Sequence, residues 1–441
     1  MTQNSQDKQT LVHSQAEPRK AKAETSFHEA IVIPITMAYA EGGYTAPIYV
    51  GSEKRLVNVL LDTGSSALAV RADKVLPDQD AHLKPTPLAQ AIAYGAGGWA
   101  GPVVHSQIGI GHDDEQVVLD DVALALIVEE PQRNFFEADG IWGLAYAPLD
   151  TVHDMSDYLQ QQGSDIAHTY PWPFNAVADH NELKSFQKLF KQYPTVHITP
   201  YFTAMEEDGR CSNKFALYTQ RAFYHMTEAD EAESELLHDP LNTGFLILGG
   251  GEEHTHLYHG ELEAVSVVHD VYYNTRIKKF QVDGFAAMDV ERIQPKYEKS
   301  YQSNSIFDCG SSFMVLTDPM YQYFTDCLSK LEPGLLDLVA AGQKAARQLT
   351  GLPMSKLHLP HWPDLHFVME GEYGDVTLTC PATHYWQINA PGEGEAMFTV
   401  ISQLDGWANQ SILGLPLLSN YFCVFDRSEH ELGVIRTAKR K

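Results

Sequence analysis

The sequence predicts a mostly β protein that is built from two related halves. From residue 31 onward, short apolar runs alternate with glycine-rich turns, which is typical of all-β domains. One motif occurs twice, as Leu-Leu-Asp-Thr-Gly-Ser-Ser at residues 60–66 and as Ile-Phe-Asp-Cys-Gly-Ser-Ser at residues 306–312. An apolar-apolar-Gly segment follows each copy and ends at Gly143 and at Gly414. Together these observations indicate one structural unit used twice, with loops of unequal length.

Each copy of the motif predicts a carboxylate at the end of a buried strand. The apolar run is typical of such a strand, and the glycine allows the chain to turn sharply after it. Asp62 and Asp308 would then be poorly solvated, so each needs hydrogen-bond donors or a partner. The flanking serines can donate, and each carboxylate can be the partner of the other. A single Asp-Thr-Gly is weak evidence, but two copies in matching apolar contexts are much stronger.

A pair of carboxylates in contact has a definite chemistry. Both cannot ionise cheaply, so they share one proton and their pKa values separate. The ionised member can deprotonate a water molecule held between them, and the protonated member can donate to a carbonyl oxygen. This chemistry hydrolyses an amide by general acid-base catalysis, without a covalent intermediate.

These motifs resemble those of the pepsin-type aspartic proteases, a family in which proton sharing between two aspartates is established behaviour. The resemblance extends from about Ile31 to Arg436. Four further segments carry it, in the order that the family has them: the flap tip at residues 91–97, the segment behind the first catalytic loop at 139–146, the Leu-Gly-Gly hairpin at 246–250 and the closing segment of the second lobe at 411–426.

The resemblance implies a mainly β, bilobal pepsin-like fold, with two related β-barrel-like lobes and an active-site cleft between them. We expect a flexible arm at residues 1–29, an N-terminal lobe at 30–203 and a C-terminal lobe at 204–441. The expected landmarks are the Asp62 loop, the flap around Tyr94 and an insertion at 147–180 in the first lobe, and the Asp308 loop and an insertion at 207–242 in the second.

The resemblance also implies a site and an activity. Asp62 and Asp308 would form the catalytic dyad and hold the attacking water, while Ser65 and Ser311 would hydrogen-bond their outer carboxylate oxygens. The expected activity is that of an aspartic endopeptidase with an acid pH optimum and a preference for hydrophobic residues around the scissile bond. Its partners would be peptide or protein substrates and pepstatin-like inhibitors, and it would need neither a cofactor nor a metal.

The residues between the acids and the serines are expected to support the dyad. They are Thr63 and Gly64 in the first loop and Cys309 and Gly310 in the second. In the family, a Thr or Ser hydroxyl from each loop hydrogen-bonds across the lobe junction and locks the loops together. Cys309 replaces the second hydroxyl, and a thiol is a weaker donor, so we expect half of this lock to be weaker. A redox-sensitive role for Cys309 is an alternative that we do not favour.

The flap is expected to close over the substrate through Tyr94 and Gly95. The family usually places a tryptophan seven residues after the first aspartate, where it helps to hold the flap tyrosine. This chain has Ala69 there, so the support of Tyr94 must differ. Trp99, from the same flap segment, is our candidate to fill the space.

The composition limits which binding partners and which cellular compartment we expect for this protein. The formal net charge of -27 argues against nucleic acid and anionic membrane as partners. The first 30 residues are polar, and no stretch resembles a signal peptide or a membrane span. Five scattered cysteines, with none of the family's usual pairs recognisable, favour reduced thiols. We therefore expect a cytoplasmic monomer, most similar to the bacterial cytoplasmic pepsin homologues of the shewasin type.

Two other functions remain open at this point. A binding protein on the same fold is possible because fold alone does not guarantee activity, although such proteins usually lose an aspartate or a flanking glycine. A metal-dependent hydrolase is weaker, because the spacing of His254, His256 and His259 fits no recognised metal motif.

Two helices are also predicted. One would end at Pro194, capped at its start by Asp179 or Asn181, and the other would have Asp318 as its N-cap. Their apolar faces are Leu183, Phe186, Leu189, Phe190 and Tyr193 in the first, and Met320, Tyr323, Phe324, Cys327, Leu328 and Leu331 in the second.

Overall fold

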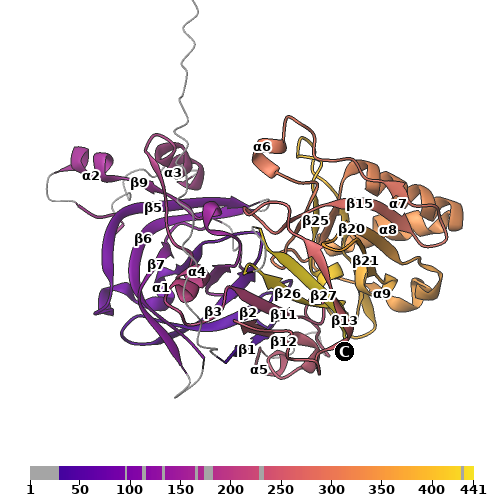
Figure 1. The fold of residues 1–441 in the computed structure, drawn as a ribbon, viewed down its shortest axis with the longest axis horizontal. Coiled ribbons are helices and arrows are strands. Elements are labelled where there is room, and N and C mark those ends of the chain that lie inside the picture. The colour runs from indigo at the N-terminus through magenta and orange to yellow at the C-terminus, as the bar shows by residue number, and fades with distance from the viewer. Residues whose placement is uncertain are drawn as a thin grey trace, which may run out of the picture.

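In the computed structural model, two mainly β lobes lie side by side, which confirms the predicted fold class (Figure 1). Of Tyr94, Glu182 and Glu233 only the backbone is described. Apart from Glu29, the predicted N-terminal arm lies outside the described residues, as do the predicted helix caps Asp179 and Asn181. The described residues are 29–94, 97–111, 116–131, 135–163, 167–172, 182–227, 233–428 and 432–441.

The first lobe is a set of antiparallel and parallel strands with short helices at its edges. Its strands are β1 (Ile31–Thr36), β2 (Thr45–Val50), β3 (Arg55–Asp62), β4 (Leu68–Arg71), β5 (Lys84–Tyr94), β6 (Gly97–Ile110), β7 (Val117–Ile127), β8 (Gly140–Gly143), β9 (Thr151–Asp154) and β10 (Thr195–His197). Its helices are α1 (Ala72–Val75), α2 (Ser156–Gln162), α3 (Glu182–Phe190) and α4 (Tyr201–Glu207).

The second half of the chain contains shorter strands and longer helices. Its first strands are β11 (Lys214–Tyr218), β12 (Thr243–Leu248), β13 (Tyr258–Ser266), β14 (Asn274–Thr275), β15 (Ile277–Val282), β16 (Met288–Asp289), β17 (Ser305–Phe307), β18 (Met314–Leu316) and β19 (Leu352–Pro353). Its remaining strands are β20 (Leu365–Glu370), β21 (Asp375–Cys380), β22 (Trp386–Ile388), β23 (Glu395–Phe398), β24 (Val400–Ser402), β25 (Ser411–Leu413), β26 (Tyr421–Asp426) and β27 (Val434–Arg440). Its helices are α5 (Glu233–Leu236), α6 (Glu298–Tyr301), α7 (Asp318–Leu331), α8 (Gly334–Ala346), α9 (Ala382–Tyr385) and α10 (Leu415–Leu418).

The repeated unit predicted from the sequence is present in both lobes. In the first lobe, β8 runs parallel to β3 and antiparallel to β4, and β4 runs parallel to β7. In the second lobe, β25 runs parallel to β17 and antiparallel to β18, and β18 runs parallel to β24. Each motif aspartate therefore stands at the end of a strand that is flanked by the closing strand of its own half.

A shared sheet joins the two halves. Strand β1 pairs with β12 along its whole length, from Ile31 opposite Leu248 to Thr36 opposite Thr243. The sheet continues in the order β12-β11-β26-β27-β13. On its other side β1 pairs with β2, so the N-terminal strand connects the strands of the first lobe to those of the second half of the chain (Figure 1).

The two segments expected to be insertions contribute strands to this framework. The first, residues 147–180, includes β9, which pairs with β5 and β10. The second, residues 207–242, includes β11, which lies between β12 and β26 and is almost completely buried. The apolar residues 215–218 form this strand because they meet apolar partners on both sides, whereas the acidic run from Glu228 to Glu235 lies partly outside the described residues.

Both predicted helices form, but α3 ends at Phe190, before Tyr193 and Pro194, and α7 differs at its N-cap and in its last turn. Leu183, Phe186 and Phe190 of α3 are buried against strands β5 and β6. Helix α7 begins one residue earlier than predicted, with Thr317 rather than Asp318 at the N-cap position. The carboxylate of Asp318 instead accepts a hydrogen bond from Ser402 at 2.7 Å.

The other correction in α7 concerns its last turn. Leu331 is 46% exposed because the helix passes the edge of the core there, whereas the earlier apolar residues of the face are covered.

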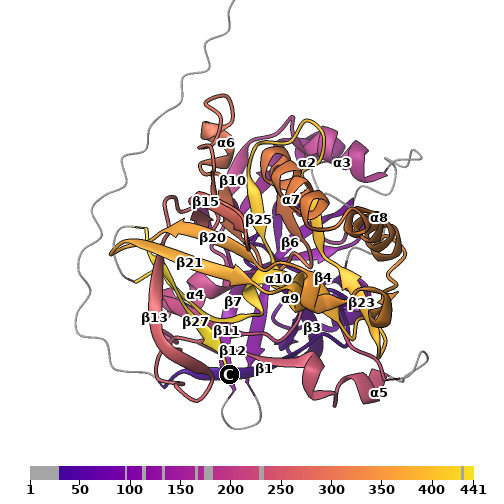
Figure 2. The same cartoon turned by 90° about the vertical axis from the view of Figure 1, so that its right-hand side faces the viewer.

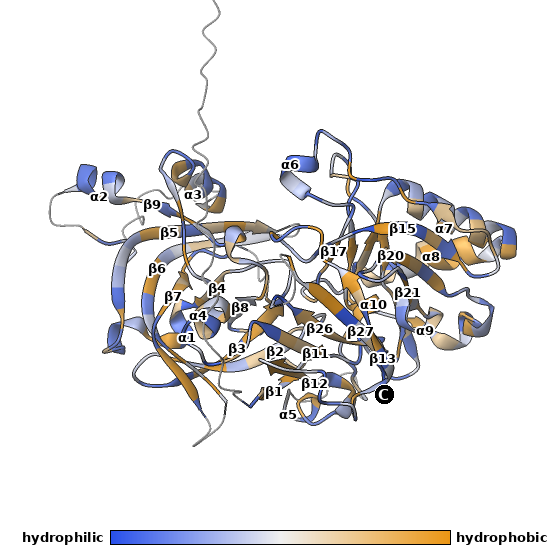
Figure 3. Cartoon of the chain, in the orientation of Figure 1, coloured by the Kyte–Doolittle hydropathy of each residue, from blue (hydrophilic) through white to orange (hydrophobic). Residues whose placement is uncertain are grey.

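Helices α7 and α8 pack on the side of the second lobe that is turned away from the first (Figure 2). Apolar residues concentrate in the strands, and α2 and α6 are mostly polar (Figure 3). No helix in the described part of the chain has the length and apolar character that crossing a membrane requires.

Candidate active site

The two motif carboxylates stand at equivalent places in the two lobes. Strand β3 ends at Asp62, which lies opposite Gly143 in the parallel pairing with β8. The N–H of Leu144 donates to the Asp62 carbonyl at 2.7 Å. Asp308 follows β17 directly, and its own N–H donates to the carbonyl of Leu413 at 3.1 Å. Each aspartate is thus held through its backbone by the closing strand of its lobe.

The structure brings the two loops into contact, and the motif glycines make this possible. A Cβ atom added to Gly64 would lie 2.9 Å from Cγ of Asp308. One added to Gly310 would lie 2.4 Å from Oδ1 of Asp62. Any side chain at these positions would therefore push the opposite carboxyl away. With glycine at both, the carboxyl groups of Asp62 and Asp308 come close enough for the charge of Asp62 to raise the pKa of Asp308.

The two carboxyl groups have different surroundings. Asp62 accepts a hydrogen bond from the N–H of Gly64 at 2.7 Å and another from the hydroxyl of Ser65 at 2.5 Å. Burial raises the pKa of Asp308 well above its usual range, and the charge of Asp62 and the hydrogen bond with it raise it further. The N–H of Gly310, 3.0 Å from Asp308 Oδ1, opposes this only in part. These surroundings favour the protonated form of Asp308.

Ser311 does not occupy the position expected from the resemblance. Its hydroxyl donates to the carbonyl of Phe313 at 2.8 Å rather than to the carboxylate of Asp308. The turn after Gly310 brings this carbonyl within reach, two residues along the chain. Ser65 does bind Asp62 as expected, so the two loops are not equivalent, and a protonated Asp308 has less need of a second donor.

The expected brace between the loops is present, with one long bond. The Thr63 hydroxyl donates to the carbonyl of Phe307 at 3.0 Å and accepts from the N–H of Cys309 at 2.8 Å. In return, the Cys309 thiol donates to the carbonyl of Leu61 at 3.5 Å. Burial, followed by the charges of the two aspartates, raises the pKa of this thiol, so it stays protonated and remains a donor.

Comparison with known protein families gives a match to the model described as eukaryotic aspartyl protease, over residues 43–169 and 234–437. These two stretches cover most of the chain and include both motifs. The chain belongs to the aspartyl protease family. It is therefore a hydrolase that acts as a peptidase, and its substrates are peptides or proteins. Residues 147–169, which the sequence suggested were inserted, lie within the matched part of the protease.

The segment expected to be the flap belongs to the hairpin of β5 and β6, in which Tyr94 lies opposite Gly97. The side chain of Tyr94 and the whole of Gly95 lie outside the described residues, so their expected contact with substrate stays a prediction. Trp99 is fully buried and belongs to the same apolar cluster as Ala69, which is fully buried too. This agrees with the expectation that Trp99 fills the space left at Ala69.

Sequence reasoning missed one residue close to the dyad of the protease. The pKa of Tyr272 is raised first by its burial and then by the charges of Asp62 and Asp308. No motif in the sequence marks Tyr272. Its position in the chain is the available signal. The Tyr272-Tyr273 pair immediately precedes β14, and β14 pairs with β17, the strand that leads into Asp308.

The histidine segment does not form a metal site among the described residues. The rings of His254 and His256 are 5.7 Å apart, and His254 lies 3.4 Å from the carboxylate of Glu253. No group of three or more His, Cys, Asp or Glu side chains in the described ranges is arranged to hold a metal ion.

Proposed function

We propose that this protein is an endopeptidase in which Asp62 and Asp308 act together on a water molecule. The observation that carries the proposal is the close approach of the two loops, in which Gly64 lies against the carboxyl group of Asp308 and Gly310 against that of Asp62. In the free enzyme, Asp62 is ionised and Asp308 holds the shared proton. A water molecule between them can give a proton to Asp62 while its oxygen attacks the substrate carbonyl carbon, and Asp308 donates its proton to the carbonyl oxygen.

The return of these protons completes the reaction. The tetrahedral intermediate carries two hydroxyl groups, and Asp62 now holds the proton that came from water. Transfer of that proton to the amide nitrogen allows the C–N bond to break, which releases the amine. One intermediate hydroxyl returns its proton to Asp308 as the carboxylic acid forms. Ser65 supports this cycle by donating to Asp62 while it is ionised.

We also propose an acid pH optimum and a preference for hydrophobic residues around the scissile bond. The raised pKa of Asp308 supports the first, because the shared proton must be retained for the reaction. Aromatic residues beside the loops support the second. Phe313 follows the second motif, is partly buried and packs edge-on against Phe223, with ring centroids 5.4 Å apart. Tyr272 adds another aromatic surface near the dyad.

The remaining expectations belong to the same proposal. The protease acts as a cytoplasmic monomer of the bacterial shewasin type, is inhibited by pepstatin-like compounds and binds neither nucleic acid nor membrane. Five free and buried cysteines support a reducing compartment. The lobes divide at residues 203 and 204, with the arm at residues 1–29 outside both.

The test is a peptide-library digest from pH 3 to 8 with four proteins: the wild type, Asp62→Asn, Asp308→Asn and the double variant. We expect cleavage by the wild type, inhibition by a statine-type compound, and a loss of at least ~10³-fold in each single variant. The double variant should be no worse than either single variant because the pair acts as a unit. Substantial activity in a folded single variant would refute the dyad, and a folded wild type without activity at any pH would indicate a binding protein.

A further inference from the structure

Arg427 lies behind the dyad, immediately after β26, in a box of aromatic rings. The centre of its guanidinium is 4.6 Å from the ring centroid of Tyr146, 5.0 Å from that of Phe202, 5.3 Å from that of Tyr273 and 6.0 Å from that of Phe215. No carboxylate among the described residues lies within 4.0 Å of it. The rings attract the cation but do not fix its orientation, so its hydrogen bonds must do so.

On the side of the first lobe, Arg427 binds the segment that holds the first catalytic loop. Its Nη2 donates to the carbonyl of Leu144 and, at 2.9 Å, to the carbonyl of Ala145. The N–H groups of these two residues face the loop. Leu144 donates to the carbonyl of Asp62 at 2.7 Å, and Ala145 donates to the carbonyl of Ser65 at 2.8 Å. Only one residue, either Leu144 or Ala145, therefore stands between Arg427 and the first loop.

On the side of the second lobe, Arg427 binds Tyr273. Its Nε donates to the Tyr273 hydroxyl at 2.7 Å, and that hydroxyl donates to the carbonyl of Leu144 at 3.0 Å. The main-chain carbonyl of Tyr273 accepts a hydrogen bond from the N–H of Phe307 at 3.1 Å. Phe307 directly precedes Asp308, so a single residue also separates Arg427 from the second loop.

We propose that Arg427 is a positioning residue that fixes the separation of the two catalytic carboxyl groups from behind. The proposal rests on the Asp62–Asp308 dyad proposed above. In a site of low dielectric the interaction between two carboxyl groups depends steeply on their distance, so a small displacement of either loop changes how the pair shares its proton. Arg427 adds a second connection between the loops to the brace between Thr63 and Cys309, in which the thiol makes the long bond.

Only arginine has the donors that this arrangement uses. Its planar fork donates from Nε towards Tyr273 and from Nη2 towards Leu144 and Ala145, and hydrogen bonds from a charged donor are stronger than neutral ones. Lysine would keep the positive charge and the contact with the rings, but it is a single point of donation on a flexible stem. Charge and geometry can therefore be separated by mutation.

The test compares Arg427→Met and Arg427→Lys with the wild type. We expect kcat to fall by about 10- to 100-fold in both, because small misplacements of reacting groups have effects of this size. KM should change by less than about 2-fold, since Arg427 does not line the substrate side of the loops. The decisive reading is the pH profile of kcat, whose two limbs should move relative to each other by at least about 0.5 pH unit in both variants.

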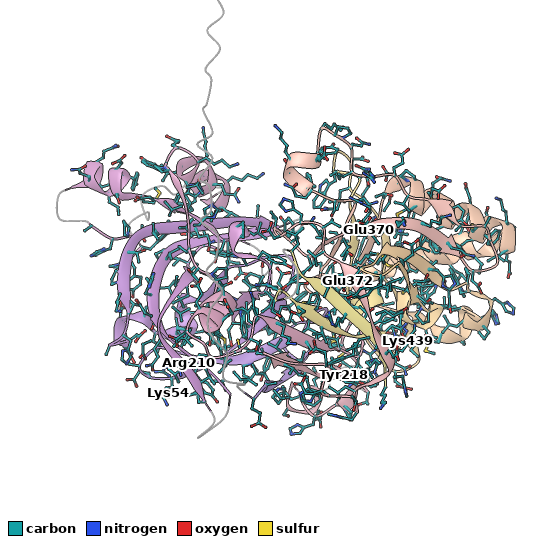
Figure 4. All side chains as sticks on the ribbon, in the orientation of Figure 1. Lys54, Arg210, Tyr218, Glu370, Glu372 and Lys439 are labelled. Carbon is teal, nitrogen blue, oxygen red and sulfur yellow. The ribbon has the colours of Figure 1, made fainter. Side chains whose placement is uncertain are left out.

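The matched control is Arg440→Met. Arg440 also lies over an aromatic ring, that of Tyr218 at 5.8 Å, and also donates to a main-chain carbonyl, that of Ser419 at 2.9 Å. Its contacts with Tyr218, Ser419 and Gln220 involve no residue of either catalytic loop. Tyr218 and Lys439, which mark its surroundings, are labelled in Figure 4. This variant should lose thermal stability to a similar extent as Arg427→Met. The two limbs of its pH profile of kcat should stay where they are in the wild type.

If both Arg427 variants kept the pH profile of kcat of the wild type, the proposal would be overturned and Arg427 would have a purely structural role. The same conclusion would follow if Arg440→Met shifted the limbs equally. If Arg427→Met does not fold, the lysine variant alone decides. Failure of the dyad itself is recognised separately, because it would appear as residual activity in Asp62→Asn or Asp308→Asn, in which Arg427 is intact.

Discussion

Thr63 and Cys309 brace each other across the lobe junction with unequal bonds. The Thr63 hydroxyl makes bonds of 2.8 and 3.0 Å to the second loop, whereas the Cys309 thiol reaches the carbonyl of Leu61 only at 3.5 Å. A thiol is a weak donor, so the second half of the brace contributes less than the first. The asymmetry is chemical rather than topological, because the strands around both residues have the same arrangement.

Replacing Cys309 with serine should therefore strengthen the brace. The hydroxyl is smaller than the thiol and a better donor, and the carbonyl of Leu61 is already in place. We expect unfolding free energy to rise by about 0.5–1.5 kcal/mol, with kcat within about 3-fold of the wild type. Urea unfolding at pH 5 measures the first and a steady-state assay the second.

The control for this prediction is Cys423→Ser. Cys423 is also buried, in strand β26, but its thiol makes no hydrogen bond within the described part of the chain. A serine there would bury an unsatisfied hydroxyl and should cost about 1–3 kcal/mol. If Cys309→Ser destabilises the protein as much as Cys423→Ser does, the brace has no energetic role.

The rate of peptide cleavage should depend on pH as a bell with its maximum at roughly pH 4 to 5. The acid limb reports protonation of the ionised member of the pair, and the other limb reports loss of the shared proton. The pKa of Asp308 is raised by burial and by Asp62, which moves the second limb above the usual carboxyl range. We nevertheless expect little turnover at neutrality, as in the aspartic proteases. Enzyme held at pH 7.5 and assayed at pH 4.5 should regain full activity, which distinguishes titration from unfolding. An optimum at or above pH 7 would contradict this prediction and point first to Cys309 and Ala69.

Asp150 should make the protein less stable as the pH rises. It is only 2% exposed, accepts a hydrogen bond from Gln90 at 2.9 Å, and has a pKa raised by burial to about 7. Because the folded-state pKa lies above the unfolded value, the folded protein binds the proton more tightly. Its contribution to stability is complete below about pH 4 and is lost as the pH rises through 7.

Asp150→Asn removes this ionisation and keeps an acceptor for Gln90. We expect the variant to exceed the wild type in unfolding free energy by about 4 kcal/mol at pH 8, and to match it at pH 3.5. Denaturant unfolding at the two pH values measures both. The control is Asp121→Asn, since a hydrogen bond from Lys84 lowers the pKa of Asp121. Asp121→Asn should have the opposite effect: it should lower the unfolding free energy at pH 8, and this loss should disappear below the folded-state pKa of Asp121. Equal behaviour of the two variants would refute the assignment.

Chelators and thiol reagents should leave the protease active. The proposed reaction uses two carboxyl groups and water, and all five cysteines are buried. Burial raises the pKa of Cys423 to about 12 and that of Cys211 to about 12, with the charge of Glu206 adding to the latter, so neither thiol forms a thiolate at neutral pH. Incubation with EDTA or iodoacetamide before the assay tests this. Inactivation by EDTA that zinc reverses would instead implicate His254 and His256.

Removal of residues 1–28 should not abolish activity, whereas removal of residues 1–36 should prevent folding. The second truncation deletes β1, whose residues Ile33 and Ile35 are buried in the core and whose backbone pairs with β12. Mass spectrometry of the active species, with assays of both truncations, measures this. An active species that begins beyond Ile31 would show that the strand is dispensable.

The sequence by itself determined the repeated unit, the two catalytic loops and the faces of α3 and α7. These features are local: a short apolar run, a glycine at a turn and the period of a helix can each be recognised within about a dozen residues. The glycines of the two motifs are also part of this local pattern. Their reason is not local, since Gly64 makes room for Asp308 and Gly310 for Asp62.

Only the tertiary structure decided which groups those local elements meet. It directs the hydroxyl of Ser311 to Phe313, places residues 215–218 in the middle of the sheet that joins the halves, and brings Trp99 into the cluster around Ala69. It also joins Arg427 to Leu144, 283 residues earlier in the chain. Contacts of this kind leave no periodic trace in the sequence, because their geometry depends on how two lobes pack and not on how either one begins or ends its strands.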